Sequence, residues 1–196
     1  MALAGVPLAL ILIFYLTPIS GVQSSPAIII KDTVPLLTRS VLPTHEPVSL
    51  GFPVRLKIPK IKVDADLEYT GLTPQGAVDV PKDFTKVSWF NLGPRPGEIG
   101  NAVITGHYGW KNGKTSVFDN LYKLRVGDKL SVTDENGKII SFVVRKIRRF
   151  DPKADASDVF ISQDGKSHLN LITCEGIWNK ILKSYSKRLV VFTDKE

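Results

Sequence analysis

The chain contains very little cysteine and histidine: Cys174 is its one thiol, and there are three histidines among 196 residues. A lone thiol cannot close an internal disulfide, and it cannot supply a multi-cysteine metal site. Free cysteine is among the most buried residue types, so Cys174 could be a small core residue. A single cysteine with few histidines is also a pattern of thiol enzymes, so Cys174 could be a nucleophile. Both interpretations are open at this point.

Charge is missing from the start of the chain, where no charged side chain precedes Lys31 and residues 2–22 are almost wholly apolar. A membrane helix needs about 20 such residues, whereas the apolar core of a signal peptide has about 7–15. We predict that residues 1–23 form a transmembrane anchor or a signal segment, either retained or cleaved. Either form predicts export of the rest of the chain.

Residues 24–50 carry four prolines and show neither a helical nor a strand period, so they are predicted to be a Pro-rich tether. Residues 51–196 are the predicted folded domain. The whole chain is 43% hydrophobic and 23% charged, which excludes disorder throughout. Its net charge of +7 favours anionic surfaces such as phospholipid headgroups. The basic residues are scattered and do not alternate with stacking aromatics, so no nucleic-acid partner is predicted.

Long amphipathic helices and a βαβ rhythm are both absent from the sequence of 51–196, where short β-rich runs alternate with turn residues. An Asn-Gly step at 136–137 predicts a hairpin with a primed turn, and Trp178 and Tyr185 are predicted to pack within a loop at 175–187. The pattern predicts an all-β fold, a barrel or a sandwich. The predicted strands are 54–58, 77–80, 102–105, 129–133, 139–148, 169–174 and 188–192, and the predicted short helices are 116–122 and 156–161.

A nucleophilic thiol needs a basic neighbour, because it reacts as the thiolate and a free cysteine has a pKa of about 8.5. His45 lies in the tether. His168 begins the strand that ends at Cys174, and six residues at about 3.3 Å each place it roughly 20 Å away. His107 follows a strand and Gly106, where site residues are common, although it could be an ordinary loop histidine.

An oxyanion-stabilising group is also needed for acyl transfer. Arg188 opens the last predicted strand, but the sequence chemistry alone does not select it over Arg125, Arg148 or Arg149. Acidic pairs such as Asp64/Asp66 lack the spacing of a calcium loop, so no metal and no cofactor are predicted.

Three motifs resemble those of the sortases, the membrane-anchored cysteine transpeptidases. Asn170-Leu-Ile-Thr-Cys174 is similar to the family's Thr-Leu-x-Thr-Cys motif, and Gly97-Glu-Ile-Gly-Asn-Ala-Val-Ile-Thr-Gly-His107 is similar to the stretch that ends in its histidine. Arg188-Leu-Val-Val191 is similar to the start of its final strand. The resemblance spans about residues 54–193, and its details are closest to classes D, E and F.

The resemblance implies a closed β-barrel of about eight strands with Cys174, His107 and Arg188 as catalytic residues. It implies cleavage of a Leu-Pro-x-Thr-Gly-like sorting signal between Thr and Gly through a thioacyl-enzyme. The acyl group would pass to an amine, such as a lipid-linked cell-wall precursor or a pilin lysine. The enzyme would be a single-pass cell-membrane protein with its catalytic domain on the cell-wall side. Thr173, Glu175 and Tyr108 are expected to border the substrate groove.

The sequence departs from the family at Asn170, where Thr is usual, and after Cys174 and His107, where Pro and Arg are common. Two alternatives remain: another wall-active thiol enzyme, or an exported β-barrel that binds without catalysis. An L,D-transpeptidase is disfavoured because its Ser-x-Gly-Cys signature is absent, and Thr173 directly precedes Cys174.

Overall fold

The computed structural model describes residues 50–109, 113 and 115–196. The predicted membrane or signal segment 1–23 lies outside these residues, as does the predicted tether apart from Leu50. Within the described part of the chain, no helix has the length and apolar character that a membrane crossing requires.

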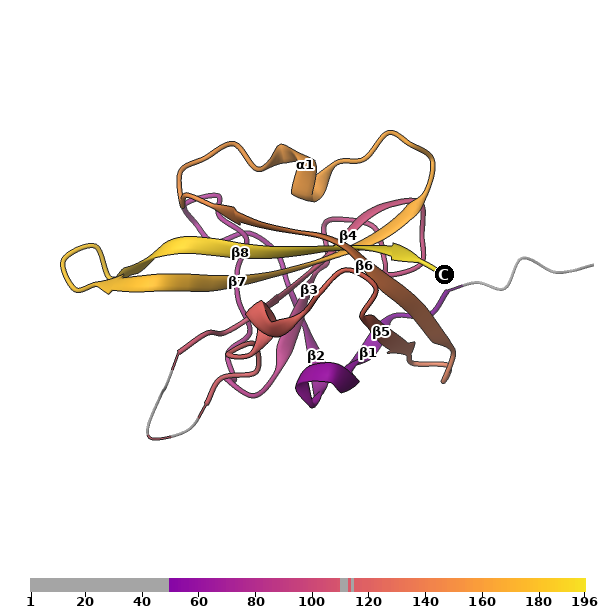
Figure 1. The fold of residues 1–196 in the computed structure, drawn as a ribbon. Helices are drawn as coiled ribbons and strands as arrows, with labels where there is room; N and C mark the ends of the chain where they lie inside the picture. Colours follow the sequence, from indigo (N-terminus) through magenta and orange to yellow (C-terminus); the bar gives the residue numbers. More distant parts are fainter. Residues whose placement is uncertain (1–49, 110–112, 114) are drawn as a thin grey trace, which may run out of the picture. The chain divides into compact units, whose positions relative to one another are not determined.

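The strands of the described domain form one closed barrel in the order β1-β2-β3-β4-β7-β8-β6-β5, with β5 paired back onto β1 (Figure 1). Neighbours are antiparallel except β2 with β3 and β4 with β7, which run parallel. This confirms the predicted all-β closed barrel. The strands are β1 Pro53–Ile58, β2 Val63–Thr70, β3 Val87–Phe90, β4 Gly100–Gly106, β5 Lys129–Asp134, β6 Ile139–Phe150, β7 Ser167–Asn179 and β8 Ser184–Lys195.

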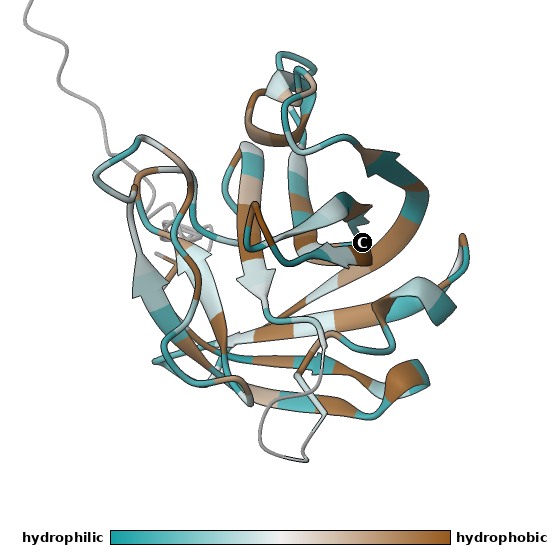
Figure 2. Ribbon diagram, turned by 90° about the vertical axis from the view of Figure 1, so that its left-hand side faces the viewer, coloured by the Kyte–Doolittle hydropathy of each residue, from teal (hydrophilic) through white to brown (hydrophobic). Residues whose placement is uncertain are grey.

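The barrel interior is filled by alternate residues of each strand, because successive strand side chains point to opposite faces. Ile104, Leu169, Leu171, Leu189 and Val191 belong to this inner core and are almost fully buried. Hydrophobic and hydrophilic bands alternate along the strands in Figure 2. Burying one such aliphatic side chain is worth about 1.5–3 kcal/mol, so the interior dominates the stability of the barrel.

A second, smaller apolar cluster lies on the outer face of β4 and β8. Val103, Val190 and Phe192 belong to it, and they are buried beneath the connection from β6 to β7. That connection carries the short helix α1, Ser157–Phe160, which contributes Val159 to the cluster. The outer face of these strands is therefore roofed, and it is on this roofed face that the candidate site lies.

Several predicted elements differ from the structure. The predicted strand 77–80 contributes only an isolated bridge between Leu72 and Val78, because this segment crosses the outer face of the barrel and lies outside its ladder. Strands β2 and β3 were missed, although β2 alternates apolar and polar residues as a strand should. The predicted helix 116–122 is a set of turns followed by a 3-10 turn, Leu121–Lys123. The predicted helix 156–161 is confirmed as the shorter α1.

The predicted hairpin joins β5 to β6, but its turn is not the primed type. Gly137 has a positive φ of 80°, whereas Asn136 is not among the residues with positive φ. The Gly137 amide donates to the Asp134 carbonyl oxygen at 2.9 Å. A type I turn followed by a glycine in the left-handed conformation is the usual three-residue hairpin loop.

Candidate functional site

The strand pairing brings the three predicted catalytic residues into one row across β4, β7 and β8. Cys174 on β7 lies directly opposite Arg188 on β8, where side chains of a cross-strand pair have Cβ atoms about 4.5–5.5 Å apart. The parallel pairing of β4 with β7 ends at Thr105 opposite Ile172. Two residues further along each chain come His107 and Cys174, so the register places the imidazole beside the thiol.

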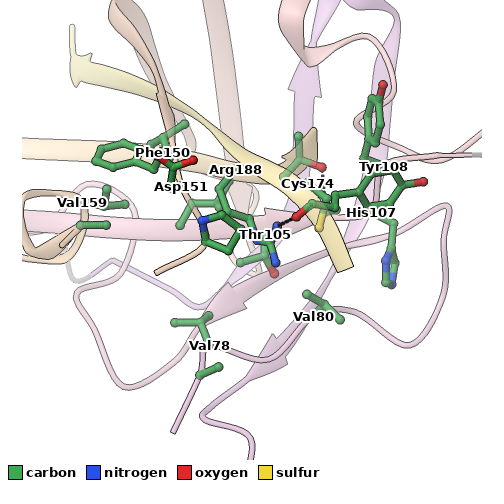
Figure 3. A pocket seen from close by; sticks show the side chains of 18 of the residues that line it. Val78, Val80, Thr105, His107, Tyr108, Phe150, Asp151, Val159, Cys174 and Arg188 are labelled. Carbon is green, nitrogen blue, oxygen red and sulfur yellow. Dashed lines mark hydrogen bonds between the residues drawn. The ribbon is translucent and has the colours of Figure 1, made fainter. Parts of the chain in front are cut away.

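The row opens onto a cavity of about 820 Å³ on the roofed outer face (Figure 3). Most of its walls are apolar, whereas Cys174, His107 and Arg188 line it together. A mostly apolar cavity with a few convergent polar groups is the usual form of a binding site. The cavity is lined by Ala77, Val78, Val80, Phe84, Thr105, Gly106, His107, Tyr108, Phe150, Asp151, Pro152, Ala154, Ala156, Val159, Phe160, Ile172, Thr173, Cys174, Trp178, Tyr185, Arg188 and Val190.

The Cys174 thiol is partly buried in this cavity. Burial raises the pKa of the Cys174 thiol, because the thiolate is poorly solvated there, and the positive charge of Arg188 opposes that effect. Burial is the larger influence, so the resting group is the thiol. A reaction at this sulfur therefore needs a nearby proton acceptor.

The His107 ring is held in one orientation by two contacts. It stacks on the Phe84 ring with centroids 3.9 Å apart and an interplanar angle of 11°. Its Nε2 lies 2.7 Å from the Pro81 carbonyl oxygen. A carbonyl oxygen can only accept, so Nε2 carries the proton, and Nδ1 of the neutral ring is left to accept one.

Gly106 permits the close packing that precedes His107. A Cβ atom built on Gly106 would meet the Phe118 ring at 2.4 Å. The Phe118 amide in turn donates to the His107 carbonyl oxygen at 3.0 Å. The end of β4 is therefore fixed against the turn that follows the candidate histidine.

The Arg188 guanidinium is anchored by the hairpin that joins β7 to β8. Its Nη1 donates to the carbonyl oxygens of Tyr185 and Lys187, each at 3.0 Å. Its Nη2 donates to Ser184 Oγ at 3.1 Å. A guanidinium with five N–H donors retains further donors for a substrate after these three bonds.

Thr173 is buried and serves a positioning contact instead of presenting its hydroxyl to the cavity. Its Oγ1 donates to the carbonyl oxygen of Gly106 at 2.8 Å. This bond ties the residue before Cys174 to the residue before His107. Thr173 is among the residues that line the cavity, as expected, but its hydroxyl is committed to the neighbouring strand.

Tyr108 lines the cavity as expected, and it does so within an aromatic cluster that the sequence interpretation missed. The Tyr108 and Trp178 rings each pack edge-on against Tyr185, with centroids 5.2 and 5.1 Å from it. The predicted loop 175–187 is a continuation of β7 and β8 as a two-stranded ribbon. Trp178 and Tyr185 therefore stand on strands beside the thiol, and the alternation of Tyr185 with Ser184 and Ser186 was the available signal.

Glu175 does not line the cavity, contrary to our expectation. Its carboxylate forms a two-pronged ion pair with Arg149, with N–O distances of 2.6 and 2.9 Å. Cys174 and Glu175 are consecutive on β7, and consecutive strand residues face opposite sides. The carboxylate therefore points away from the thiol.

Asn170, the departure from the family motif, holds the roof of the cavity. Its amide nitrogen donates to the Val159 carbonyl oxygen in α1 at 2.7 Å. Asn101 on β4 makes a similar bond to the Asp158 carbonyl oxygen at 3.0 Å. A threonine side chain at position 170 is shorter and would not reach as far. Asparagine in place of the usual threonine therefore helps to hold α1 over the site.

His168 lies at the other end of β7 from the thiol, in agreement with the distance argument. Its Nδ1 lies 2.6 Å from Asp194, and its Nε2 lies 3.0 Å from Asp164. The Asp164 pKa is well below its usual range, chiefly because of the hydrogen bond with His168. His45 lies outside the described residues. Within the described ranges, no three His, Cys, Asp or Glu side chains gather closely enough to hold a metal ion.

The fold and the cavity define a closed β-barrel with a thiol, an imidazole and a guanidinium at one cleft. The Sortase domain model matches residues 56–196 of the chain. The chain therefore belongs to the sortase family.

Solved sortase structures share this fold. Sortase C-1 from Actinomyces oris is 26% identical with a TM-score of 0.58, and the match covers 74% of each chain. Sortase C1 from Streptococcus agalactiae is 24% identical with a TM-score of 0.57 over 73% of this chain and 66% of its own length. A sortase D5 transpeptidase from Clostridium perfringens is 24% identical with a TM-score of 0.55, covering 74% of this chain and 79% of its own. No curated protein matches the chain. These relatives include classes C and D, so the expected class stays a prediction.

Proposed function

We propose that this chain is a cysteine transpeptidase that cleaves a Leu-Pro-x-Thr-Gly-like sorting signal between Thr and Gly and transfers the acyl group to an amine. The observation that carries the proposal is the row His107–Cys174–Arg188 at the wall of one apolar cavity. Membership of the sortase family supports the same reaction.

The first half of the proposed reaction is thioester formation. The Cys174 sulfur attacks the threonine carbonyl carbon, and the thiol proton passes to Nδ1 of His107. The carbonyl oxygen becomes an oxyanion that accepts hydrogen bonds from Arg188, and one such donor is typically worth about 2.7–4 kcal/mol of barrier. Collapse of the tetrahedral species breaks the Thr–Gly bond. His107 returns its proton to the leaving glycine amine, which leaves a neutral thioacyl-enzyme.

The second half restores the thiol. An incoming amine attacks the thioester, His107 takes the amine's proton, and the Cys174 sulfur leaves as the new amide forms. The proton then returns to the sulfur. Transfer prevails over hydrolysis only when the amine outcompetes water, so kinetics are ping-pong in peptide and amine.

The cavity suits the apolar part of such a peptide. Val78, Phe150 and Val159 line it away from the thiol (Figure 3). An extended peptide with its threonine carbonyl at Cys174 can place a leucine side chain against these residues. Packing there is worth about 1.5–3 kcal/mol for a fully buried leucine.

We further propose that residues 1–23 hold the enzyme at the outer face of the cell membrane, with surface proteins or pilins as substrates. The acceptor would be a pilin lysine or a lipid-linked cell-wall precursor. Tethering enzyme and acceptor to one membrane raises the effective amine concentration without any new contact.

The test is a peptide-library cleavage assay on the full chain in detergent, read by mass spectrometry with and without added amines. Cleavage after threonine and mass-shifted amide products are expected, and Cys174→Ala should abolish both. A methanethiosulfonate reagent should label Cys174 in the folded protein. Retained cleavage by Cys174→Ala would refute the catalytic role, and peptide binding without cleavage by the wild type would favour the non-catalytic alternative.

A further inference from the structure

The ribbon formed by the outer ends of β7 and β8 projects beyond the barrel and ends in an apolar tip (Figure 1). We call residues 177–183 the hairpin tip. Ile177, Ile181 and Leu182 in it are 80%, 91% and 73% exposed. Single exposed apolar residues are ordinary, but three at one protruding hairpin form an apolar patch, and such patches mark interaction sites.

Three backbone amides of the tip donate to side chains of the same ribbon. Asn179 Oδ1 accepts hydrogen bonds from the amides of Ile181 and Leu182, both at 2.9 Å. The Ile177 amide donates to Ser186 Oγ at 3.0 Å. Moving an unpaired amide out of water is costly. These three amides belong to the three apolar residues and already have partners, so removing them from water leaves no unpaired N–H group at those residues.

The charge around the tip has one sign. Residues 176–188 contain four basic residues and no acidic one. Lys187 pairs with Asp151, and Arg188 is bonded to the ribbon backbone. The two lysines at the turn itself, Lys180 and Lys183, are exposed and flank Ile181 and Leu182. Apolar residues between lysines match a surface with an apolar interior and anionic headgroups.

Size and aromatic placement decide between a lipid and a protein partner. The tip is only residues 177–183 at the end of a two-stranded ribbon, whereas a stable protein interface takes about 20–30 residues on each partner. Trp178 and Tyr185 stand directly behind the apolar residues and pack on each other. Tryptophan and tyrosine are enriched at the headgroup level of membrane interfaces.

From these observations we propose that the hairpin tip inserts Ile177, Ile181 and Leu182 into an anionic lipid surface, with Lys180 and Lys183 at the headgroups. This docking is independent of the proposed reaction. It would orient the domain with Cys174 five strand residues from Asn179, or about 17 Å above the tip. In Figure 2 the end of the domain that carries the tip faces the viewer.

The test uses tryptophan emission of the full chain in phosphatidylcholine vesicles with brominated acyl chains, with or without phosphatidylglycerol. The chain has three tryptophans, and none precedes Trp89, so the N-terminal segment is silent. Trp178 should be quenched, and more strongly with phosphatidylglycerol. Trp178→Phe gives the background of the other two.

Separate variants test the apolar and the electrostatic contributions to docking. Ile181→Ser with Leu182→Ser should lower the docked-to-undocked ratio at least about tenfold, and each of Lys180→Ser and Lys183→Ser should lower it about fivefold at low salt. Ile99→Ser and Val126→Ser are matched controls, since both residues are exposed elsewhere, and they should change nothing.

Equal quenching in the tip variants and the controls would overturn the proposal, as would no quenching of Trp178 in the wild type. Loss of a dimer in the tip variants, seen by light scattering without vesicles, would also overturn it in favour of a second copy. Peptide cleavage in detergent by the Ile181→Ser, Leu182→Ser variant should match the wild type. Failure of the proposed function would instead appear as an absence of peptide cleavage by the wild type in the same detergent assay.

Discussion

The two faces of strands β4, β7 and β8 differ in kind although they share one backbone ladder. On the inner face, Ile104, Leu171 and Leu189 fill the barrel. On the outer face, Cys174 on β7, Arg188 on β8 and His107 just after the end of β4 line the cavity. The inner positions require side chains of the right volume to fill the core, whereas the outer positions require particular functional groups. A strand's period of two thus lets neighbouring residues serve stability and reactivity separately.

The inner face should govern stability alone. Leu171→Ala is expected to lower the free energy of unfolding by about 2–5 kcal/mol, because it leaves a cavity in a packed core. Denaturant unfolding measures this. Activity per folded molecule should stay near the wild-type value. A large fall in turnover of the fully folded variant would break the separation of the faces.

The outer face should govern the reaction. Arg188→Lys is expected to lower kcat about 10²–10³-fold, because a point charge cannot reproduce the planar donors of a guanidinium at an oxyanion. Peptide-cleavage kinetics measure this, with thermal unfolding as the check on folding. Unchanged turnover would remove Arg188 from the reacting group.

Thr173 is the point where the two faces are linked, because its inward hydroxyl holds the strand end that carries His107. Thr173→Val keeps the shape but removes the hydrogen bond between this side chain and the Gly106 carbonyl oxygen, at a cost of about 0.5–1.5 kcal/mol. A lower kcat with little change in KM is expected as His107 shifts. Thr173→Ser keeps the hydroxyl donor, so its kcat and its stability should return to near the wild-type values. Failure of that rescue would argue for a purely packing role.

The smallest expected effect is on the pH dependence of thiol labelling. Because burial raises the Cys174 pKa, iodoacetamide labelling of the folded protein should have its inflection above the value of about 8.5 for a free cysteine. Arg188→Gln removes a charge that favours the thiolate, so the inflection should move higher. An inflection below that of a free cysteine would contradict this environment.

The raised thiol pKa also has a consequence for stability. The thiol of the unfolded chain ionises at a lower pH than the folded one. Its contribution is therefore full below the unfolded pKa and declines as the pH rises through the folded value. Cys174→Ala should remove this part of the decline at alkaline pH, measured by denaturant unfolding over that range.

Local patterns of residues were enough for the all-β class and the position of most strands, whereas the three candidate catalytic residues were selected by motifs that resemble those of the sortases. Period-two alternation and turn residues mark a strand whatever it pairs with, and short motifs such as Asn170-Leu-Ile-Thr-Cys174 are contiguous. The Asn136-Gly137 hairpin was predictable for the same reason. Its turn type was not, because the flanking strands determine which backbone angles the turn adopts.

Pairing between distant segments was decided only in three dimensions. No local signal says that Thr173 donates to Gly106, 67 residues away, or that Asn170 holds α1 over the cavity. The same holds for Glu175, which looked like a groove residue by its position next to Cys174 and faces Arg149 instead. Barrel closure and strand register set which side chains meet, and both depend on the whole ladder. The sequence by itself determined which segments form strands and which motifs they carry. The pairing of the whole barrel decided which side chains lie next to one another.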